Sequence, residues 1–195
     1  MKSSRHIIPL VALLLLCGIS ASAQTAPSGG KEFKKDGLSF YYPSGWQFND
    51  ASDSDKQQLT FGNSDVEAQI TIFVFRTSIT SPEQMAEAKR ILVDKYVAAQ
   101  TASFEREGAK PQSSPATKEI SNAPADGVVI RLTLDGVPGA AEIYWGLVGQ
   151  RLVVLTLFRP DQAVSKAAPA WDMIRNTMNI EAPQPKPSPS PKANP

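Results

Sequence analysis

The segment at residues 151–159 constrains the fold more than any other part of this chain, because it is apolar on both faces. In an extended strand, Leu152 and Val154 point to one face, and Val153 and Leu155 point to the other. A strand of this kind is stable only when a layer covers each face of its sheet. We therefore predict that this segment is a central strand between two layers.

The remaining strand signals fall into two runs that are separated by one long helical segment. Asp36-Gly37 and Gly149-Gln150 are residue pairs typical of tight hairpin turns, so the strands that flank each pair should be antiparallel neighbours. We expect strands at residues 32–35, 38–42, 46–48, 58–62 and 68–76 before the helical segment, and at 117–121, 127–134, 140–148 and 151–159 after it.

A long helix is predicted from about Pro82 to Arg106. Ser81 can cap its first turn, and Gln84, three residues later, completes a capping box. Gly108 is a natural stop signal. The apolar face of this helix should consist of the residues that follow helical spacing, which are Met85, Ala88, Leu92, Tyr96 and Ala99.

A second helix is predicted after Pro160-Asp161. Val164, Trp171 and Ile174 follow helical spacing, and Pro169 should kink this helix or mark its effective start. Runs of strands with only two substantial helices indicate an α+β fold in which helices cover an antiparallel sheet, that is, an α/β/α sandwich.

The N-terminus has the parts of a signal peptide in their usual order. Two basic residues precede an apolar run at 7–16, and Ala21-Ser22-Ala23 is a small-residue cleavage site. We therefore expect cleavage after Ala23 and a periplasmic or secreted protein. Lipid attachment at Cys17 is the alternative, but the bulky Leu16 before it fits a lipoprotein peptidase site poorly.

The rest of the chain divides by composition. Residues 24–30 are small and polar and are predicted to be a flexible leader, and residues 31–180 should form a single globular domain. In residues 181–195 prolines alternate with polar residues, which predicts a disordered, Pro-rich tail. Such a tail is usually only solvated, although it could also be a spacer or a ligand for a partner domain.

Catalytic and metal-binding residue types are scarce in the predicted domain. His6 and Cys17 are the chain's one histidine and one cysteine, and cleavage would remove both. Histidine bases, cysteine nucleophiles, disulfides and the usual zinc sites are then excluded, so we predict no catalytic residues, no metal and no cofactor. Ser165 and Lys166 are adjacent and would not face each other on a helix, so they predict no Ser–Lys dyad.

The charge of the chain offers no surface for nucleic acid. Cleavage after Ala23 would remove two basic residues and no acidic one, so the formal net charge would fall from +1 to −1. A nearly neutral chain without a basic run has no electrostatic footprint for nucleic acid or for an anionic membrane surface. We also expect no transmembrane segment after cleavage.

The most acidic stretch contains Asp50, Asp53 and Asp55. A calcium loop needs oxygen ligands at alternate positions, a glycine at its sharp turn and a late bidentate glutamate. If Asp53 were the first ligand, Gln58 would stand at the glycine position and Ser64 at the glutamate position. The pattern therefore favours a solvated polar loop, with a weak surface cation site as the alternative.

Four further carboxylates could supply an acid–base pair. Glycoside hydrolysis needs two carboxyl groups roughly 5–9 Å apart across the sugar. Glu119, Asp126, Asp135 and Glu142 are the candidates, although turn and strand-surface roles explain each of them.

The aromatic residues that a binding site could use are Tyr41, Tyr42, Trp46, Tyr144 and Trp145. Neighbours in a strand point to opposite faces, so one residue of each adjacent pair should belong to the core while the other could line a groove. Core packing is the more frequent role for any one of them.

The sequence at residues 37–46, GLSFYYPSGW, resembles the opening signature of the PsbP/Mog1/DcrB-like domains, in which a glycine, alternating hydrophobic residues, a proline and a tryptophan follow in this order. The end of the domain is also similar to that family, with Tyr144-Trp145, the hairpin at 149–150, the apolar strand at 152–158 and a closing helix that contains Trp171. The resemblance covers most of the predicted domain and implies an antiparallel sheet between helices. Members are mostly accessory subunits, binding proteins and envelope proteins, and they share no functional site that could be transferred here.

These observations together favour a non-catalytic function. We expect an exported accessory or binding module of the cell envelope that acts through another envelope protein or a small ligand. A carboxylate-based hydrolase of the glycosidase type is the alternative, and it requires two carboxylates that converge in a cleft.

Overall fold

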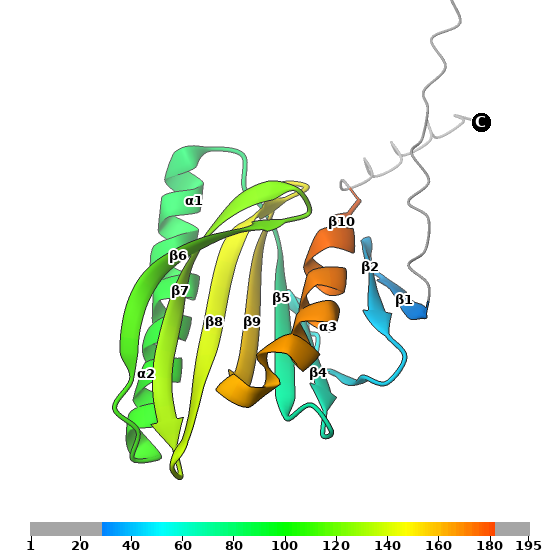
Figure 1. Ribbon diagram of the computed structural model, residues 1–195. Coiled ribbons are helices and arrows are strands. Elements are labelled where there is room, and N and C mark those ends of the chain that lie inside the picture. Colours follow the sequence, from blue (N-terminus) through cyan, green and yellow to red (C-terminus); the bar gives the residue numbers. More distant parts are fainter. Residues whose placement is uncertain (1–28, 182–195) are drawn as a thin grey trace, which may run out of the picture.

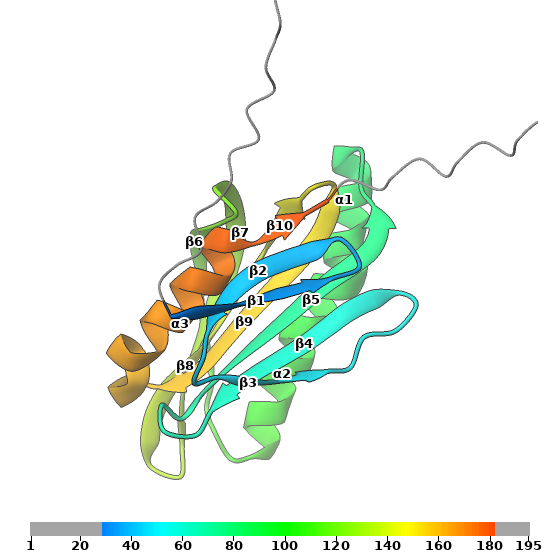
Figure 2. The same cartoon turned by 90° about the vertical axis from the view of Figure 1, so that its right-hand side faces the viewer.

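The computed structural model describes residues 29–181, which form three layers (Figure 1). A large sheet lies in the middle, one long helical segment covers one face, and a helix with a small sheet covers the other (Figures 1 and 2). The predicted signal peptide, nearly all of the predicted leader and the Pro-rich tail after Glu181 lie outside the described residues. No helix within residues 29–181 is long and apolar enough to cross a membrane.

The large sheet has seven antiparallel strands in the order β3-β4-β5-β9-β8-β7-β6. Its strands are β3 (Gln47–Asp50), β4 (Lys56–Asn63), β5 (Ala68–Ser78), β6 (Gln112–Ile120), β7 (Ala123–Leu134), β8 (Val137–Val148) and β9 (Arg151–Pro160). β9 has three strands on each side, which confirms the prediction of a central strand. Its neighbours are β5 and β8.

The two faces of β9 belong to two different hydrophobic clusters. Val153 and Leu155 are buried against the layer that contains the small sheet, and Leu152 and Val154 are buried against the long helical segment. All four side chains are almost completely inaccessible to solvent. The predicted burial of both faces of this strand is therefore confirmed.

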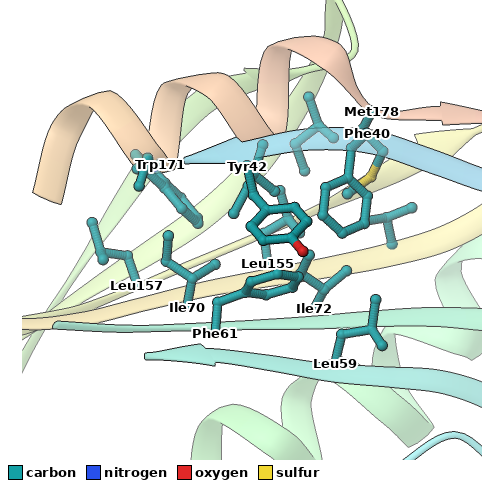
Figure 3. Close-up of a cluster of buried hydrophobic side chains, with 14 of the residues drawn as sticks. Phe40, Tyr42, Leu59, Phe61, Ile70, Ile72, Leu155, Leu157, Trp171 and Met178 are labelled. Atoms are coloured by element: carbon teal, nitrogen blue, oxygen red, sulfur yellow. The ribbon is translucent and has the colours of Figure 1, made fainter. Parts of the chain in front are cut away.

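The second layer contains a small sheet, β1 (Gly30–Lys35), β2 (Leu38–Pro43) and β10 (Asn179–Ile180), together with helix α3 (Val164–Thr177). Figure 3 shows the core between this layer and the large sheet, with Phe40 and Tyr42 of β2 above Phe61 of β4 and with Trp171 of α3 beside them. The ring centroids of Tyr42 and Phe61 are 5.0 Å apart. The small sheet is thus attached to the large one by aromatic packing.

The long helical segment comprises α1 (Pro82–Ala88), a π-helical turn η1 (Lys89–Val93) and α2 (Asp94–Arg106). Its ends agree with the prediction, and Ser81 caps it by accepting a hydrogen bond from the backbone N–H of Gln84. The predicted apolar face is wrong in its second half, where Ala99 is exposed and Val93 and Phe104 are buried. The π turn inserts one extra residue, which rotates the apolar face of α2 by about 100° relative to an unbroken helix.

Three further boundaries differ from the prediction. The strand predicted at 117–121 begins five residues earlier, at Gln112, and Pro115 is tolerated there because β6 is an edge strand. Helix α3 begins at Val164, after a 3₁₀ turn at Asp161–Ala163, so Pro169 lies inside the helix and does not mark its start. The short strand β10 was not predicted, because two residues carry no periodicity.

Candidate binding cleft

The main candidate site is an apolar cleft between the long helical segment and the large sheet. Its volume is about 1000 Å³. The sheet contributes Phe73 and Phe75 from β5 and Leu152 and Val154 from β9, and the helical segment contributes Ala88, Ile91, Leu92 and Tyr96. Ligand sites in proteins are typically concave, mostly apolar and of this size.

The cleft is open because the helical segment is only partly buried. α1 has no buried residue, and Ile91 in the π turn is 38% exposed although it is a large aliphatic residue. The floor is better fixed, because the rings of Phe73 and Tyr96 meet edge to face with centroids 5.1 Å apart. Tyr96 Oη also lies 3.0 Å from Thr156 Oγ1 on β9, and burial raises the pKa of this phenol.

Charged residues at the rim are distributed unevenly. Glu83 and Glu87 lie on α1, where the Ser81 hydroxyl lowers the pKa of Glu83 and Arg90 lowers that of Glu87. Lys95 lies two turns after Glu87 and makes no ion pair with a described residue. Asp94, the acidic residue next to it in the chain, is paired with Lys89 at 2.6 Å.

The cleft continues into a smaller, polar extension of about 420 Å³. Phe73 and Tyr96 line both spaces and therefore mark the boundary between them. About half of the residues that line the extension carry amides or hydroxyls, namely Gln58 and Thr60 of β4, Gln69 and Thr71 of β5, Gln100 and Ser103 of α2, and Thr156 of β9. Its one charged residue is Glu107, whose carboxylate accepts a hydrogen bond from Ser103 Oγ at 3.2 Å. A mainly apolar space and a more polar space thus follow one another along the helix.

A second group of polar residues lies on the opposite face of the sheet, around Glu142. Arg159 Nη2 donates to Glu142 Oε1 at 2.8 Å, Tyr144 Oη donates to Oε2 at 3.3 Å, and Lys118 Nζ lies 3.5 Å from Oε2. Lys118 Nζ also lies over the rings of Tyr144 and Trp171, at 5.4 and 5.9 Å from their centroids. Burial, and then the negative charge of Glu142, raise the pKa of Tyr144 to about 12.

The four carboxylates considered for a hydrolase are not gathered in one place, and none of them lines the apolar cleft. Lys118 faces Glu142, so the next residue, Glu119, points to the other face of the sheet. Asp126 is also on that other face, because it pairs with Trp145, the neighbour of Tyr144. Asp135 lies in the turn between β7 and β8 with a positive φ of 49°. Glu142 is therefore separated from the other three, and its carboxylate is held by basic residues.

The acidic loop is a hydrogen-bonded turn. Asp53 Oδ1 accepts from the backbone N–H groups of Asp55 and Lys56, and its Oδ2 binds Lys56 Nζ at 2.8 Å. Asp50 binds Lys35 Nζ at 2.7 Å. These hydrogen bonds, led by those of the two lysines, lower the pKa values of Asp53 and Asp50 to about 2. Within residues 29–181 no three His, Cys, Asp or Glu residues are grouped so that they could hold a metal ion.

The aromatic candidates belong mainly to the core. Tyr42, Trp46, Tyr144 and Trp145 are all buried, and Tyr41 is half-buried beside α3, where its backbone N–H donates to Thr177 Oγ1 at 2.8 Å. None of these five residues lines the apolar cleft. Ser165 and Lys166 are exposed neighbours at the start of α3 and form no dyad.

Sequence reasoning missed the residues that form the cleft. Phe73 and Phe75 were identifiable as the second apolar face of their strand, which requires a cover that the helix supplies only in part. Ile91 lies outside the predicted apolar face of the helix, so a regular α-helix would point its side chain away from the sheet. A large aliphatic residue that does not follow the spacing of the apolar face was the one sequence signal that pointed to an exposed apolar site.

Comparison with known proteins gives the fold. No family model matches the chain, and no curated protein matches its sequence. Among solved structures, a crystal structure from Bacteroides thetaiotaomicron is similar with 17% identity and a TM-score of 0.51, over 78% of this chain and 49% of that one, so this chain spans about half of that protein. The solution structure of cyanobacterial PsbP (CyanoP) from Synechocystis has 9% identity and a TM-score of 0.49, over 84% of this chain and 99% of that one.

The fold expected from the sequence is confirmed. The chain is an α+β protein in which helices cover antiparallel sheet, and it shares this fold with the structure from Bacteroides thetaiotaomicron. At these identities the likeness concerns the fold only, and the cleft has to be judged by its own residues.

Proposed function

We propose that this protein is an exported, non-catalytic binding module of the cell envelope that receives an apolar group in the cleft between its long helical segment and its sheet. The observation that carries the proposal is the cleft itself, in which Phe73, Phe75, Ile91 and Leu152 provide apolar walls without an occupant of the described chain. A contiguous, partly exposed apolar surface rimmed by polar residues is typical of an interaction site.

Two other features support the proposal. The PsbP-like fold is compatible with a non-catalytic accessory module. Of the carboxylates considered for a hydrolase, Glu142 lies on one face of the sheet and Glu119 and Asp126 on the other, and none of the three lines the apolar cleft. Export rests on the N-terminal sequence, where an apolar run precedes the small residues at 21–23.

Site-specific photo-crosslinking in intact cells tests binding. A photoreactive amino acid is placed at Ile91 in the cleft or, as the control, at Val164 at the start of α3. The two side chains are similarly exposed, at 38% and 44%, but lie on opposite sides of the large sheet. We expect a specific adduct from position 91 alone, identified by mass spectrometry. Equal adducts from both positions, or none from position 91, would contradict a function for the cleft.

Export is tested separately on the same cells. The protein released from the envelope fraction is analysed for its N-terminus, which should be Gln24. A protein that retains Met1 and remains in the cytoplasm would contradict the envelope assignment and would leave the cleft to be assessed by binding alone.

A further inference from the structure

We infer that the natural occupant is a single-chain anionic lipid, with its acyl chain in the apolar cleft, its negative phosphate at Lys95 and a hydroxylated head in the polar extension. This inference rests on the proposed function and specifies its ligand. It follows from the order of apolar, basic and hydrogen-bonding residues along one side of the helical segment.

The shape of the cleft suits one extended chain. On the helical segment its lining reaches from Glu83 to Tyr96, a rise of roughly 20 Å along the axis. Phe73 and Phe75 face this stretch from β5, and Leu152 faces it from β9. Apolar contact along the whole length and an opening to solvent are what a flexible hydrocarbon chain requires.

The charges give the chain a direction. Glu83 at the α1 end makes no ion pair with a described residue and would repel an anionic head, while Glu87 beside it is paired with Arg90 at 2.6 Å. Lys95, at the other end of the cleft lining, also has no ion-pair partner among the described residues. The other lysine of the cleft, Lys56, is already bound by Asp53. A phosphate is therefore accepted best at Lys95, which lines the cleft and directly precedes Tyr96, a residue that lines both the cleft and the extension.

The extension suits an uncharged, hydroxylated head. The side chains of Gln58, Thr60 and Gln100 line it and make no hydrogen bond with any residue in the part of the chain that the structure describes. Amides and hydroxyls both donate and accept, so they can bind glycerol or sugar hydroxyls in place of water. An acyl chain alone would leave these groups without a role.

Binding of lysophosphatidylglycerol to the purified full chain, below the micelle concentration of the lipid, tests the inference. We expect saturable binding that weakens about tenfold when the acyl chain is shortened by two methylenes. Lys95→Glu should weaken binding by about tenfold, because a repulsion replaces an attraction. Lys166→Glu, which alters an exposed lysine on α3, should leave the affinity unchanged.

Two comparison ligands separate this inference from the proposed function. Lysophosphatidylcholine has the same chain and no net charge, and Nile red is a neutral apolar probe. Equal affinity for both lipids with no effect of Lys95→Glu would overturn the anionic head, and Nile red binding that Ile91→Glu abolishes would still support the cleft. A protein adduct at position 91 without lipid binding would also overturn the lipid. Failure of Nile red, both lipids and the crosslink would refute the proposed function as well.

Discussion

Replacing Gly127 by alanine should create a steric overlap between the new methyl group and the ring of Tyr144. The two residues are cross-strand partners in β7 and β8, and the aromatic ring lies directly on the glycine. A Cβ at position 127 would lie 2.3 Å from Tyr144 Cδ1 and 2.7 Å from the carbonyl oxygen of Ile143. Both distances are far below van der Waals contact, so the ring or the backbone must move.

The cost follows from what holds the ring in place. Tyr144 is buried, lies 6.2 Å from the ring of Trp171 and donates to Glu142 at 3.3 Å. Overpacking a well-packed site costs about 1–3 kcal/mol. Loss of a hydrogen bond to a charged acceptor adds about 1 kcal/mol or more. We therefore expect Gly127→Ala to lower the free energy of unfolding by about 2–4 kcal/mol, and Tm by roughly 5–10 °C for a domain of this size.

Urea denaturation followed by circular dichroism measures the effect, and Gly62→Ala is the matched control. Gly62 lies in β4, and a Cβ there would meet no atom within 4 Å. That variant should be neutral or more stable by up to about 1 kcal/mol, because alanine restricts the unfolded chain. The reasoning is refuted if Gly127→Ala unfolds within about 0.5 kcal/mol of the wild type, or if both variants lose the same stability.

Three further predictions concern ionisable side chains. The pKa of Tyr144 is raised to about 12, so the free energy of unfolding should fall by about 2–3 kcal/mol as the pH rises from about 10 to about 12. Urea titrations at alkaline pH should show a smaller fall for Tyr144→Phe. Glu142→Gln should lower the free energy of unfolding by about 3 kcal/mol at neutral pH, because the guanidinium of Arg159, whose side chain is only 9% exposed, loses its nearest carboxylate. An unfolding midpoint equal to that of the wild type would argue against this. The pKa of Asp50 is lowered to about 2, so its contribution is present above about pH 4 and is lost as the pH falls toward 2; Asp50→Asn should remove less than about 1 kcal/mol of acid-sensitive stability in low-salt melts.

The sequence was sufficient to predict that β9 is a central strand beside β8 but not the phase of the long helix. Residues 151–159 alternate two apolar sets, and only a central, doubly covered position buries both, so their environment follows from composition alone. The π turn at Lys89–Val93 has no comparable signature. Whether the helix keeps or shifts its phase depends on Val93 and Phe104 packing against strands that are distant in the sequence.

The candidate site was less predictable than the fold for the same reason. Four of the five aromatic residues singled out from the sequence are buried in the core, as the frequency of aromatic residues in cores indicates, and Tyr41 is half-buried. The cleft instead depends on the distance between the long helical segment and β5, which no local sequence pattern predicts. Phe73 and Ile91 become neighbours of one open space only because the helix covers part of the sheet.

The position of β9 has a consequence for how this domain comes apart. The strand contributes alternate side chains to both hydrophobic clusters, so neither outer layer can detach without exposing half of the same strand. Leu155 links it to the small-sheet side and Val154 to the long-helix side. The two clusters should therefore melt in a single cooperative transition, as one thermodynamic unit, even though they are separated by a continuous sheet.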